Sequence, residues 1–316
     1  MGNDAAMTLA GNLASVMGGA RIEGLTRLSG GASRETWMFS ADGENMVLQR
    51  QRDGATRGMS IEASVLRAAH AAGVAVPELI VDGGKSKELG NPFFVVRAVQ
   101  GETIARKIQR DDEFAHARTV LTADMGRAMA ATHSIPVTSV PGLIEQDEIA
   151  YYRKVLDDTG EPHPVFEVAF RWLESNRPTG TGKTVVHGDF RLGNVMVDRN
   201  GLTAVLDWEL AHIGDPMEDL GWVCVKAWRF GGPKPVAGIG EYAELFDAYE
   251  AAGRPRPDFE VVRWWEVLGT LKWGIMCIIQ GASHLNGFTR SHELAAIGRR
   301  VCENEWDLLE LLKGRV

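Results

Sequence analysis

The fold of this chain is decided by residues 185–222, which read VVHGDFRLGNVMVDRNGLTAVLDWELAHIGDPMEDLGW. Apolar runs flank a polar loop, His187–Asn194, and a further apolar run, Leu202–Leu206, leads directly into Asp207. The turn sequence Asp198-Arg199-Asn200-Gly201 separates the last two runs, which is typical of a β-hairpin. The pattern predicts short strands that end in polar residues, and a rigid scaffold can hold such residues in fixed positions.

Asp189, Asn194 and Asp207 are the polar residues that this pattern brings to the strand ends. Asn194 follows Asp189 by 5 positions, and Asp207 follows Asn194 by 13. Transfer of a phosphoryl group needs a carboxylate beside the attacking hydroxyl and oxygen ligands for Mg²⁺ on the nucleotide phosphates. Because Mg²⁺ keeps several waters, one aspartate and one asparagine suffice as its protein ligands. The spacing therefore indicates phosphoryl transfer, with a hairpin whose loop is merely solvated as the plainer alternative.

A loop of the form His-x-Asp-x-x-x-x-Asn, followed by an aspartate on a strand, is the pattern of the protein kinases. Here Asp207-Trp208-Glu209 stands in place of the usual Asp-Phe-Gly, and Gly214-Asp215-Pro216 and Asp219-Leu220 follow. With these departures the segment resembles the aminoglycoside phosphotransferase and choline kinase superfamily. It is more similar still to the kinase-like domain that is fused to some acyl-CoA dehydrogenases.

This resemblance implies an α+β fold with two lobes, of the protein-kinase-like type. Residues 1–98 are expected to form an N-lobe with a small antiparallel sheet and the nucleotide phosphate loop. Residues 99–316 are expected to form a mainly helical C-lobe with the catalytic loop and the acceptor pocket. The resemblance also implies ATP, or else GTP, as the phosphate donor, and Mg²⁺ as the metal.

Hydrophobic periodicity predicts strands in the first third of the chain and helices beyond it. The expected strands are 25–28, 35–39, 45–51, 79–82 and 92–97. The expected helices are 5–18, 59–72, 112–135, one or two within 146–176, and then 239–252, 261–280 and 293–312.

The sequence Ser29-Gly30-Gly31-Ala32-Ser33 lies between the first two expected strands. A glycine pair allows the backbone to turn tightly and to approach phosphates closely. Ala32 excludes the Gly-x-Gly-x-x-Gly pattern. The resemblance to the superfamily's Gly-Gly-x-Ser loop assigns Gly30, Gly31 and Ser33 to nucleotide binding, and an ordinary hairpin turn is the alternative.

A kinase also needs a cation on the third strand, paired with a glutamate on the following helix, to hold the nucleotide phosphates. That strand has no lysine, so Arg50 is the candidate and Glu62 its expected partner. Side chains alternate along a strand, so a register shift of one residue would place Gln49 there and weaken the clamp. A solvated edge position for Arg50 is the other alternative.

In a kinase-like fold the adenine is bound by backbone groups of the hinge between the lobes. The strand 92–97 is expected to lead into this hinge. The resemblance therefore assigns Arg97 and Val99 to the adenine, with little side-chain specificity.

The remaining roles follow from the same pattern. Asp189 is expected to orient or deprotonate the acceptor hydroxyl, and Asn194 and Asp207 to hold Mg²⁺. Arg191 is a candidate for an additional catalytic cation near the transferred phosphate, and a solvated loop charge is the alternative.

Two further residues are expected to support the site. His187 braces the loop that carries Asp189. Asp215 caps a helix that begins at Pro216, because aspartate at the N-cap and proline at the first helical position are both favoured.

Composition limits the other classes of function. The chain has 316 residues, 45% of them hydrophobic and 24% charged, as in ordinary globular proteins. Its formal net charge of −8 argues against a nucleic-acid-binding surface. No apolar run is long enough for a membrane span, and the N-terminus lacks the basic region of a secretory signal. We expect a cytoplasmic protein without nucleic-acid or membrane partners, and its oligomeric state stays open.

The cysteines Cys224, Cys277 and Cys302 are odd in number and far apart, so free thiols in a reducing compartment are expected. No pair of them has the spacing of metal ligands.

The phosphate acceptor is the open question. Lys272, within the apolar helix 261–280, suits an anionic acceptor such as a hydroxy acid or a hydroxyacyl-CoA, unless its side chain extends to the surface. An aromatic cage of Trp264, Trp265 and Trp273 would instead suit a quaternary ammonium group, although tryptophans at helical spacing are usually core. An amino alcohol is an alternative acceptor. Aminoglycosides are a further alternative, and they would require an acidic pocket.

Two readings from other classes remain. The missing lysine is compatible with a pseudokinase that binds a nucleotide without efficient transfer. A metal-dependent phosphoesterase is suggested by Asp189, Asn194, Asp207, His212 and Asp215, but a centre with two metals would need more histidines.

Overall fold

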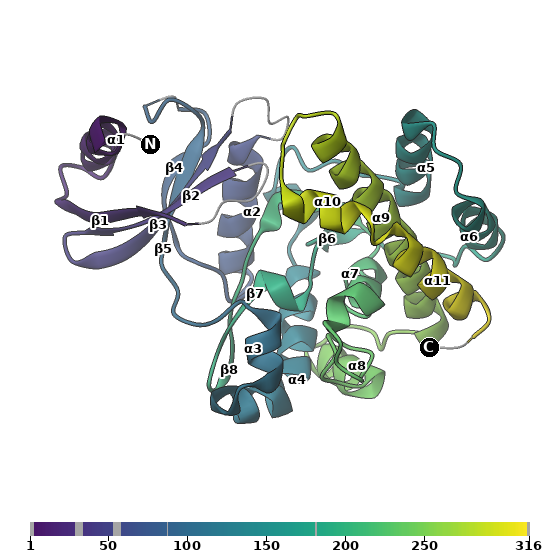
Figure 1. The fold of residues 1–316 in the computed structure, drawn as a ribbon. Coiled ribbons are helices and arrows are strands. Elements are labelled where there is room, and N and C mark those ends of the chain that lie inside the picture. Colours follow the sequence, from purple (N-terminus) through teal and green to yellow (C-terminus); the bar gives the residue numbers. More distant parts are fainter. Residues whose placement is uncertain (1–2, 29–33, 53–57, 87, 181, 315–316) are drawn as a thin grey trace.

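The computed structural model describes residues 3–28, 34–52, 58–86, 88–180 and 182–314. An antiparallel sheet stands at one end of the molecule and a larger, mainly helical part at the other (Figure 1). The two parts follow one another along the chain, since the strands of the sheet end at Arg97 and most helices come after it.

The sheet has the strand order β1-β2-β3-β5-β4, and each neighbouring pair is antiparallel. Its strands are β1 (Ile22–Arg27), β2 (Arg34–Ala41), β3 (Glu44–Gln51), β4 (Leu79–Gly83) and β5 (Phe93–Arg97). All five strands expected from the sequence are present, within three residues of their predicted bounds.

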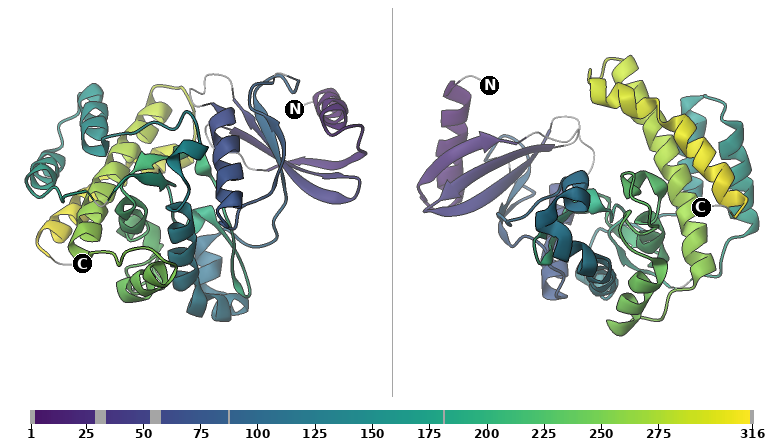
Figure 2. Two further views of the ribbon diagram at one scale, coloured as in Figure 1. Left: turned by 180° about the vertical axis from the view of Figure 1, so that it is seen from behind. Right: turned by 60° about the horizontal axis from the view of Figure 1, so that its bottom comes forward.

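Each face of the sheet packs against one helix. Trp37 and Phe39 alternate along β2 toward the face that packs on Leu9 and Leu13 of α1 (Asn3–Val16). The opposite face packs on α2 (Met59–Ala71), which stands between the sheet and the helical part (Figures 1 and 2). Residues of α2 therefore face the junction of the two parts.

The helical part contains the remaining helices and two short pairs of strands. Its helices are α3 (Ala105–Arg110), α4 (Ala115–Thr132), α5 (Glu148–Thr159), α6 (Pro164–Ser175), α7 (Met217–Trp222), α8 (Tyr242–Ala251), α9 (Phe259–Leu285), α10 (His292–Gly298) and α11 (Val301–Leu312). The helix expected over 239–252 starts later, at Tyr242, where Glu241 and Glu244 form a capping box.

The helix expected over 293–312 is divided into α10 and α11. Gly298 ends α10 and lies against Gly281 of α9, where a Cβ on Gly298 would come within 2.8 Å of the Gly281 Cα. Such close helix contact requires glycine on both sides, and the chain turns at Arg299 and Arg300 before α11 begins. Periodicity cannot show this break, because both helices carry the same apolar pattern.

The segment 185–222 forms the predicted hairpin and one further strand pair. β7 (Val195–Asp198) pairs with β8 (Gly201–Val205), and β6 (Thr184–Val186) pairs with β9 (His212–Gly214). The Asp198 side chain accepts hydrogen bonds from the backbone amides of Asn200 and Gly201, which closes the predicted turn.

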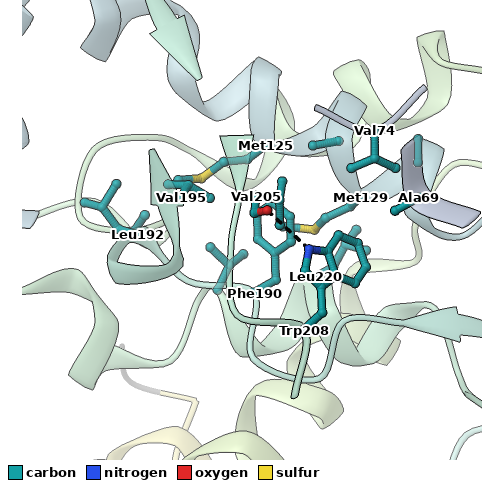
Figure 3. Close-up of a cluster of buried hydrophobic side chains, with 14 of the residues drawn as sticks. Ala69, Val74, Met125, Met129, Phe190, Leu192, Val195, Val205, Trp208 and Leu220 are labelled. Carbon is teal, nitrogen blue, oxygen red and sulfur yellow. Dashed lines mark hydrogen bonds between the residues drawn. The ribbon is translucent and has the colours of Figure 1, made fainter. Parts of the chain in front are cut away.

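A buried cluster beneath this hairpin ties it to other elements. Figure 3 shows Phe190 and Trp208 among side chains of α2, α4 and the two strands, for example Ala69, Met129 and Val205. The indole Nε1 of Trp208 donates to the carbonyl oxygen of Val205 at 3.2 Å. The polar loop 187–194 thus rests on a packed core that includes residues of α2 from the other part of the molecule.

None of the helices in the described ranges is long and apolar enough to cross a membrane.

Candidate active site

Asp189 and Asn194 lie in direct contact. The amide Nδ2 of Asn194 donates to Oδ2 of Asp189 at 2.6 Å and to its carbonyl oxygen at 3.0 Å. The backbone amide of Leu206 donates to the Asn194 carbonyl oxygen at 2.8 Å, so the residue before Asp207 is tied to the loop. Two of the three predicted side chains are thus in contact, and the loop holds the third beside them.

The Asp189 carboxylate is held by further donors. Trp222 donates through Nε1 to Oδ1 at 2.8 Å, and Arg191 donates through Nε to Oδ1 and Oδ2 at 3.1 and 3.3 Å. The Arg191 guanidinium lies over the ring of Trp228, 4.9 Å from its centroid. Asp189 therefore keeps one orientation and stays partly open, with a side-chain exposure of 16%.

His187 braces the loop, as expected from the sequence. Its Nδ1 accepts from the backbone amide of Asp189 at 3.2 Å, and its Nε2 lies 2.9 Å from the carbonyl oxygen of Leu206. Burial lowers the pKa of His187, so the ring is neutral and its proton lies on Nε2. The side chain joins the loop to the strand end before Asp207.

Asp219, which the sequence reasoning did not single out, holds the backbone of the same loop. Its carboxylate accepts from the backbone amides of His187 and Gly188 at 2.8 and 2.9 Å, and from the ring of His133 at 3.1 Å. Although burial alone would raise it, the hydrogen bond and charge of His133 lower the pKa of Asp219 to about 2. Asp219 stays ionised inside the protein and fixes the loop backbone.

Asp215 makes the capping contact expected of it. Its carboxylate accepts from the backbone amide of Met217, the first residue of α7, at 2.9 Å. The helix was expected to begin at Pro216, and it begins one residue later, at Met217. Pro216 therefore takes the N-cap position and Asp215 the position before it.

Four acidic side chains gather where the sheet faces the helical part: Glu62, Asp189, Asp207 and Glu209. Desolvation by the surrounding protein and the nearby Glu209 raise the pKa of Asp207 to about 6, although its side chain is partly exposed. Burial raises the pKa of Glu62 to about 7 despite the neighbouring Arg34. Asp207 has a left-handed backbone, with φ of 62°. Carboxylates that repel one another in this way are stabilised by a bound cation.

The donor atoms at this place fit Mg²⁺. Asn194 uses its Nδ2 for Asp189, which leaves its carbonyl oxygen Oδ1 without a protein partner among the described residues. The Asp207 side chain is 42% exposed, and its nearest cation is Arg34 at 3.7 Å. An amide oxygen and a carboxylate next to open space are ligands that Mg²⁺ prefers.

The predicted pairing of Arg50 with Glu62 is wrong. Arg50 donates to Glu35 at 2.5 Å and to the carbonyl oxygen of Leu89 at 2.8 Å. The partner of Glu62 is Arg34 of β2, at 2.6 Å. Alternation along β3 directs Arg50 to the α1 face of the sheet and Gln49 to the α2 face, where Glu62 lies. Gln49 therefore occupies the strand position expected for the cation, as the alternative register predicted.

The backbone amides of the two predicted hinge residues differ in their partners. The Arg97 amide donates to the Glu78 carbonyl oxygen at 2.9 Å, and its guanidinium pairs with Glu78 and Glu44 at the surface. That amide is used by the sheet and cannot bind adenine. Val99 is half-buried, and its amide has no protein partner within the described ranges. Gly30, Gly31 and Ser33 lie outside the described residues.

Lys272 does not border an open acceptor pocket. It is buried, and its Nζ lies 3.3 Å from Glu148, 3.2 Å from Glu218 and 3.2 Å from the carbonyl oxygen of Gly188. The adjoining cavity has a volume of about 10 Å³, room for one water molecule. The expectation that Lys272 binds an anionic acceptor is therefore wrong, because two carboxylates already neutralise its charge.

Among the described residues, the same cluster also contains the one group of three or more His, Cys, Asp or Glu side chains close enough to hold a metal, namely Glu148, His212 and Glu218. The Lys272 ammonium lies between the two carboxylates, where such a metal would bind. Despite burial, the Glu218 charge raises the pKa of His212 to about 9, so its ring carries a second positive charge. The cluster is a buried set of ion pairs beneath the loop.

A family model described as the phosphotransferase enzyme family matches residues 24–265. The chain belongs to this family. The superfamily resemblance found in the segment 185–222 is confirmed, and the site described above is that of a phosphotransferase family member.

Curated relatives of this phosphotransferase include acyl-CoA dehydrogenase family member 10 from Mus musculus. It is 25% identical over 215 residues, which cover 64% of this chain and 20% of that protein. Acyl-CoA dehydrogenase family member 11 from Pongo abelii is also 25% identical, over 60% of this chain and 26% of that protein. The chain thus spans about a fifth to a quarter of the length of these relatives.

Solved structures confirm the fold of the phosphotransferase. A proposed aminoglycoside phosphotransferase from Ralstonia eutropha has a TM-score of 0.72 and 21% identity, over 96% of this chain and 97% of that one. A thermostable mutant of aminoglycoside phosphotransferase APH(4)-Ia, in ternary complex with AMP-PNP and hygromycin B, has a TM-score of 0.64 and 20% identity, over 95% and 98%. The predicted α+β, protein-kinase-like architecture is correct.

Three side chains of this phosphotransferase site escaped the sequence reasoning: Arg34, Asp219 and Trp222. Asp219 and Trp222 belong to the segment 185–222 and follow the turn Gly214-Asp215-Pro216. Their position close to the predicted site in the sequence was the signal that could have identified them. Arg34 directly follows the glycine turn, and only the pairing of β2 with β3 shows that it reaches Glu62.

Proposed function

We propose that the chain is an ATP-dependent phosphotransferase that moves the γ-phosphate to a hydroxyl group of a small molecule. The observation that carries this proposal is the geometry of Asp189, whose two carboxylate oxygens are oriented by Trp222, Arg191 and Asn194. A carboxylate that is held in one orientation and still open to solvent can accept a hydrogen bond from an acceptor hydroxyl and take up its proton.

Asn194 and Asp207 are the proposed protein ligands of Mg²⁺. The metal would neutralise charge on the transferred phosphate, and its other ligands would be phosphate oxygens and water. Arg191 is the proposed additional cation beside the transferred group. Its Nε bonds Asp189 and its ring contact with Trp228 limits its motion, so the guanidinium can stabilise charge without a large rearrangement.

The nucleotide would bind between the sheet and the helical part. Under this proposal residues 1–98 form the nucleotide lobe and residues 99–316 the lobe that holds the acceptor. Val99 is retained as a backbone ligand for adenine, and Glu62 orients the cation of the phosphate site. AMP-PNP in the APH(4)-Ia complex is a precedent for a nucleotide on this fold.

For the acceptor we propose a hydroxy acid or a hydroxyacyl-CoA. The support comes from Arg191, the cation beside Asp189, since the charge of Lys272 is used by buried carboxylates. Its guanidinium lies over the ring of Trp228, which packs against Trp273 with 4.6 Å between the ring centroids. A guanidinium in this place suits a carboxylate or thioester oxygen better than a polycationic drug. The acyl-CoA dehydrogenase names of the relatives agree with this class.

The test of the reaction is the change Asp189→Ala. We expect phosphate transfer to fall by at least about a thousandfold, because the orienting carboxylate is lost, while Mg²⁺-ATP still raises the melting temperature. Asp158→Ala, at an exposed surface ion pair, is the matched control and should keep full activity. Full activity of Asp189→Ala would refute the proposed function.

The acceptor is tested by a coupled ATP-consumption screen over hydroxy acids, hydroxyacyl-CoAs, amino alcohols, sugars and aminoglycosides. We expect turnover with the anionic compounds. Strong turnover of an aminoglycoside, with none of a hydroxy acid or its thioester, would overturn the acceptor class and leave the reaction type intact.

A nucleotide-binding module without transfer is the second candidate, and Gln49 is the observation that favours it. This neutral side chain occupies the strand position that faces α2, where a kinase carries its cation. Stabilisation by Mg²⁺-ATP, with no turnover of ATP across the whole screen, would support this candidate.

A further inference from the structure

The α2 face of the sheet needs a cation near Glu62, and β3 does not provide one. Met46 and Leu48 of β3 are buried in the cluster that packs on α1, whereas Val47 packs toward α2. By alternation, Gln49 shares the face of Val47 and Arg50 the face of Leu48. A positive charge at this site must therefore come from another element.

Arg34 occupies the place that such a cation would take. It is the first residue of β2, and strand pairing sets it opposite Gln51, diagonal to Gln49. Its Nη1 donates to Glu62 Oε1 at 2.6 Å and to Gln49 Oε1 at 2.9 Å. The Gln49 side chain thus supports the arginine that stands where a β3 cation would otherwise point.

The guanidinium of Arg34 also reaches across to the helical part. Its Nη2 donates to Glu209 Oε2 at 2.9 Å, and Nη1 lies 3.7 Å from Asp207 Oδ1. Glu62 and Arg34 are nearly buried, with side-chain exposures of 7% and 12%, whereas Asp207 and Glu209 are more open. The nearly buried Arg34 guanidinium therefore lies between the sheet and Asp207, the proposed metal ligand.

Arg34 retains hydrogen-bonding capacity for a ligand. A guanidinium has five N–H groups. The two of Nη1 and one of Nη2 are used by Gln49, Glu62 and Glu209. The N–H of Nε and the second N–H of Nη2 have no partner among the residues that the structure describes. Two N–H donors on one planar cation match the oxygens of a phosphate.

We propose that Arg34 of β2 is the cation that binds the nucleotide phosphates, in place of a basic residue on β3. Glu62 orients the guanidinium, and Gln49 bonds it where a β3 cation would otherwise stand. This inference rests on the proposed function, since it names the phosphate ligand of the same site. It also removes the reason to regard the chain as a pseudokinase, because the charge missing from β3 is supplied by the adjacent strand.

The test relocates the charge and measures the dissociation constant of Mg²⁺-ATP by isothermal titration calorimetry, which requires no acceptor. We expect Arg34→Gln to weaken binding by about tenfold or more, the effect of losing a charged hydrogen bond to phosphate. In the double variant Arg34→Gln/Gln49→Arg the cation returns to β3 beside Glu62, and binding should recover to within about threefold of the starting protein.

Arg50→Gln is the matched control, since it removes the neighbouring charge from the opposite face and should change binding by less than about twofold. Melting temperatures of all variants test whether each is folded. If Arg34→Gln alone is unstable, the double variant still tests the proposal, because it keeps one arginine beside Glu62. Unchanged binding in Arg34→Gln, or no recovery in a folded double variant, would overturn the proposal.

A tenfold loss in Arg50→Gln would also overturn it and assign the cation to Arg50. These results leave the proposed function standing, because Asp189→Ala tests transfer separately. If the starting protein itself does not bind Mg²⁺-ATP, the proposed function and this inference fail together.

Discussion

At the scale of single residues, the site is built from side chains that restrain Asp189. One of its carboxylate oxygens accepts from Trp222 and Arg191, and the other accepts from Asn194 and Arg191. Hydrogen bonds to an ionised group are stronger than those between neutral groups. Trp222 belongs to α7 and not to the loop itself, so the orientation of the carboxylate depends on how that helix packs.

We therefore predict that Trp222→Phe lowers kcat by about tenfold and leaves the KM for ATP nearly unchanged. Phenylalanine fills most of the space but cannot donate to Oδ1, so the carboxylate loses one of the bonds that orient it. Steady-state kinetics with the acceptor found in the screen measure both constants.

Trp264→Phe is the comparison for that experiment. The Trp264 indole is also buried and donates to the carbonyl oxygen of Leu173 at 3.0 Å, in the packing of α9 against α6. It should lower stability without a change in kcat. If both variants retain the kcat of the starting protein, Trp222 does not position Asp189.

At the scale of elements, α9 carries the buried charge that supports the loop. Lys272 stands in the middle of this helix and donates to the carbonyl oxygen of Gly188, next to Asp189. Its Nζ also lies 4.9 Å from the centroid of the Trp222 ring. The helix thus contacts the site both through the loop backbone and through Trp222. α7 can come this close because Gly221 lies against Trp265, where a Cβ would approach within 2.5 Å.

We predict that Lys272→Met lowers the free energy of unfolding by about 3–5 kcal/mol, because the two buried carboxylates of Glu148 and Glu218 then share only the charge of His212. Chemical denaturation measures this change. Lys226→Met is the control: its ion pair with Asp307 is exposed, with 54% of the lysine side chain accessible, and such pairs contribute at most about 1 kcal/mol. Equal stabilities of the two variants would mean that the buried cluster is not held together by Lys272.

At the scale of the whole molecule, the sheet and the helical part meet through apolar and ionic contacts. Residues of α2 share a buried cluster with α4 and the hairpin (Figure 3), and Arg34 bonds Glu209 across the junction. The helical part is stabilised by buried ionised groups, among them Asp219. Stability of the whole fold should therefore depend on pH.

Asp219 has a pKa of about 2 in the folded protein, below its ordinary value of 3.8. Its ionised form therefore stabilises the fold above about pH 4, and this contribution is lost as the pH falls toward 2. We predict that the stability difference between the starting protein and Asp219→Asn shrinks by roughly 2 kcal/mol over that interval. Urea denaturation at a series of pH values measures it. Asp158→Asn, at the surface, should show a difference near zero at every pH, and a constant difference for Asp219→Asn would contradict the pKa shift.

The sequence by itself determined the reaction class and the elements that serve it. Spacing between Asp189, Asn194 and Asp207 indicated phosphoryl transfer, and the turn and strand pattern around them predicted the hairpin. These features are local, because Asp189, Asn194 and Asp207 stand within one segment and because strand alternation and turn residues concern neighbouring positions in the chain. The five strands of the sheet were predicted for the same reason.

Only the tertiary structure decided which charges meet. Arg34 lies 28 positions from Glu62 and 175 from Glu209, and no periodicity relates residues so far apart. The face that Arg50 takes depends on strand register, because a shift of one residue exchanges the two faces of a strand. The apolar helix around Lys272 left open whether its charge is buried or extends to the surface, and its partners Glu148 and Glu218 come from other helices. Ion pairs inside a protein are chosen by packing, and packing exists only once the chain has folded.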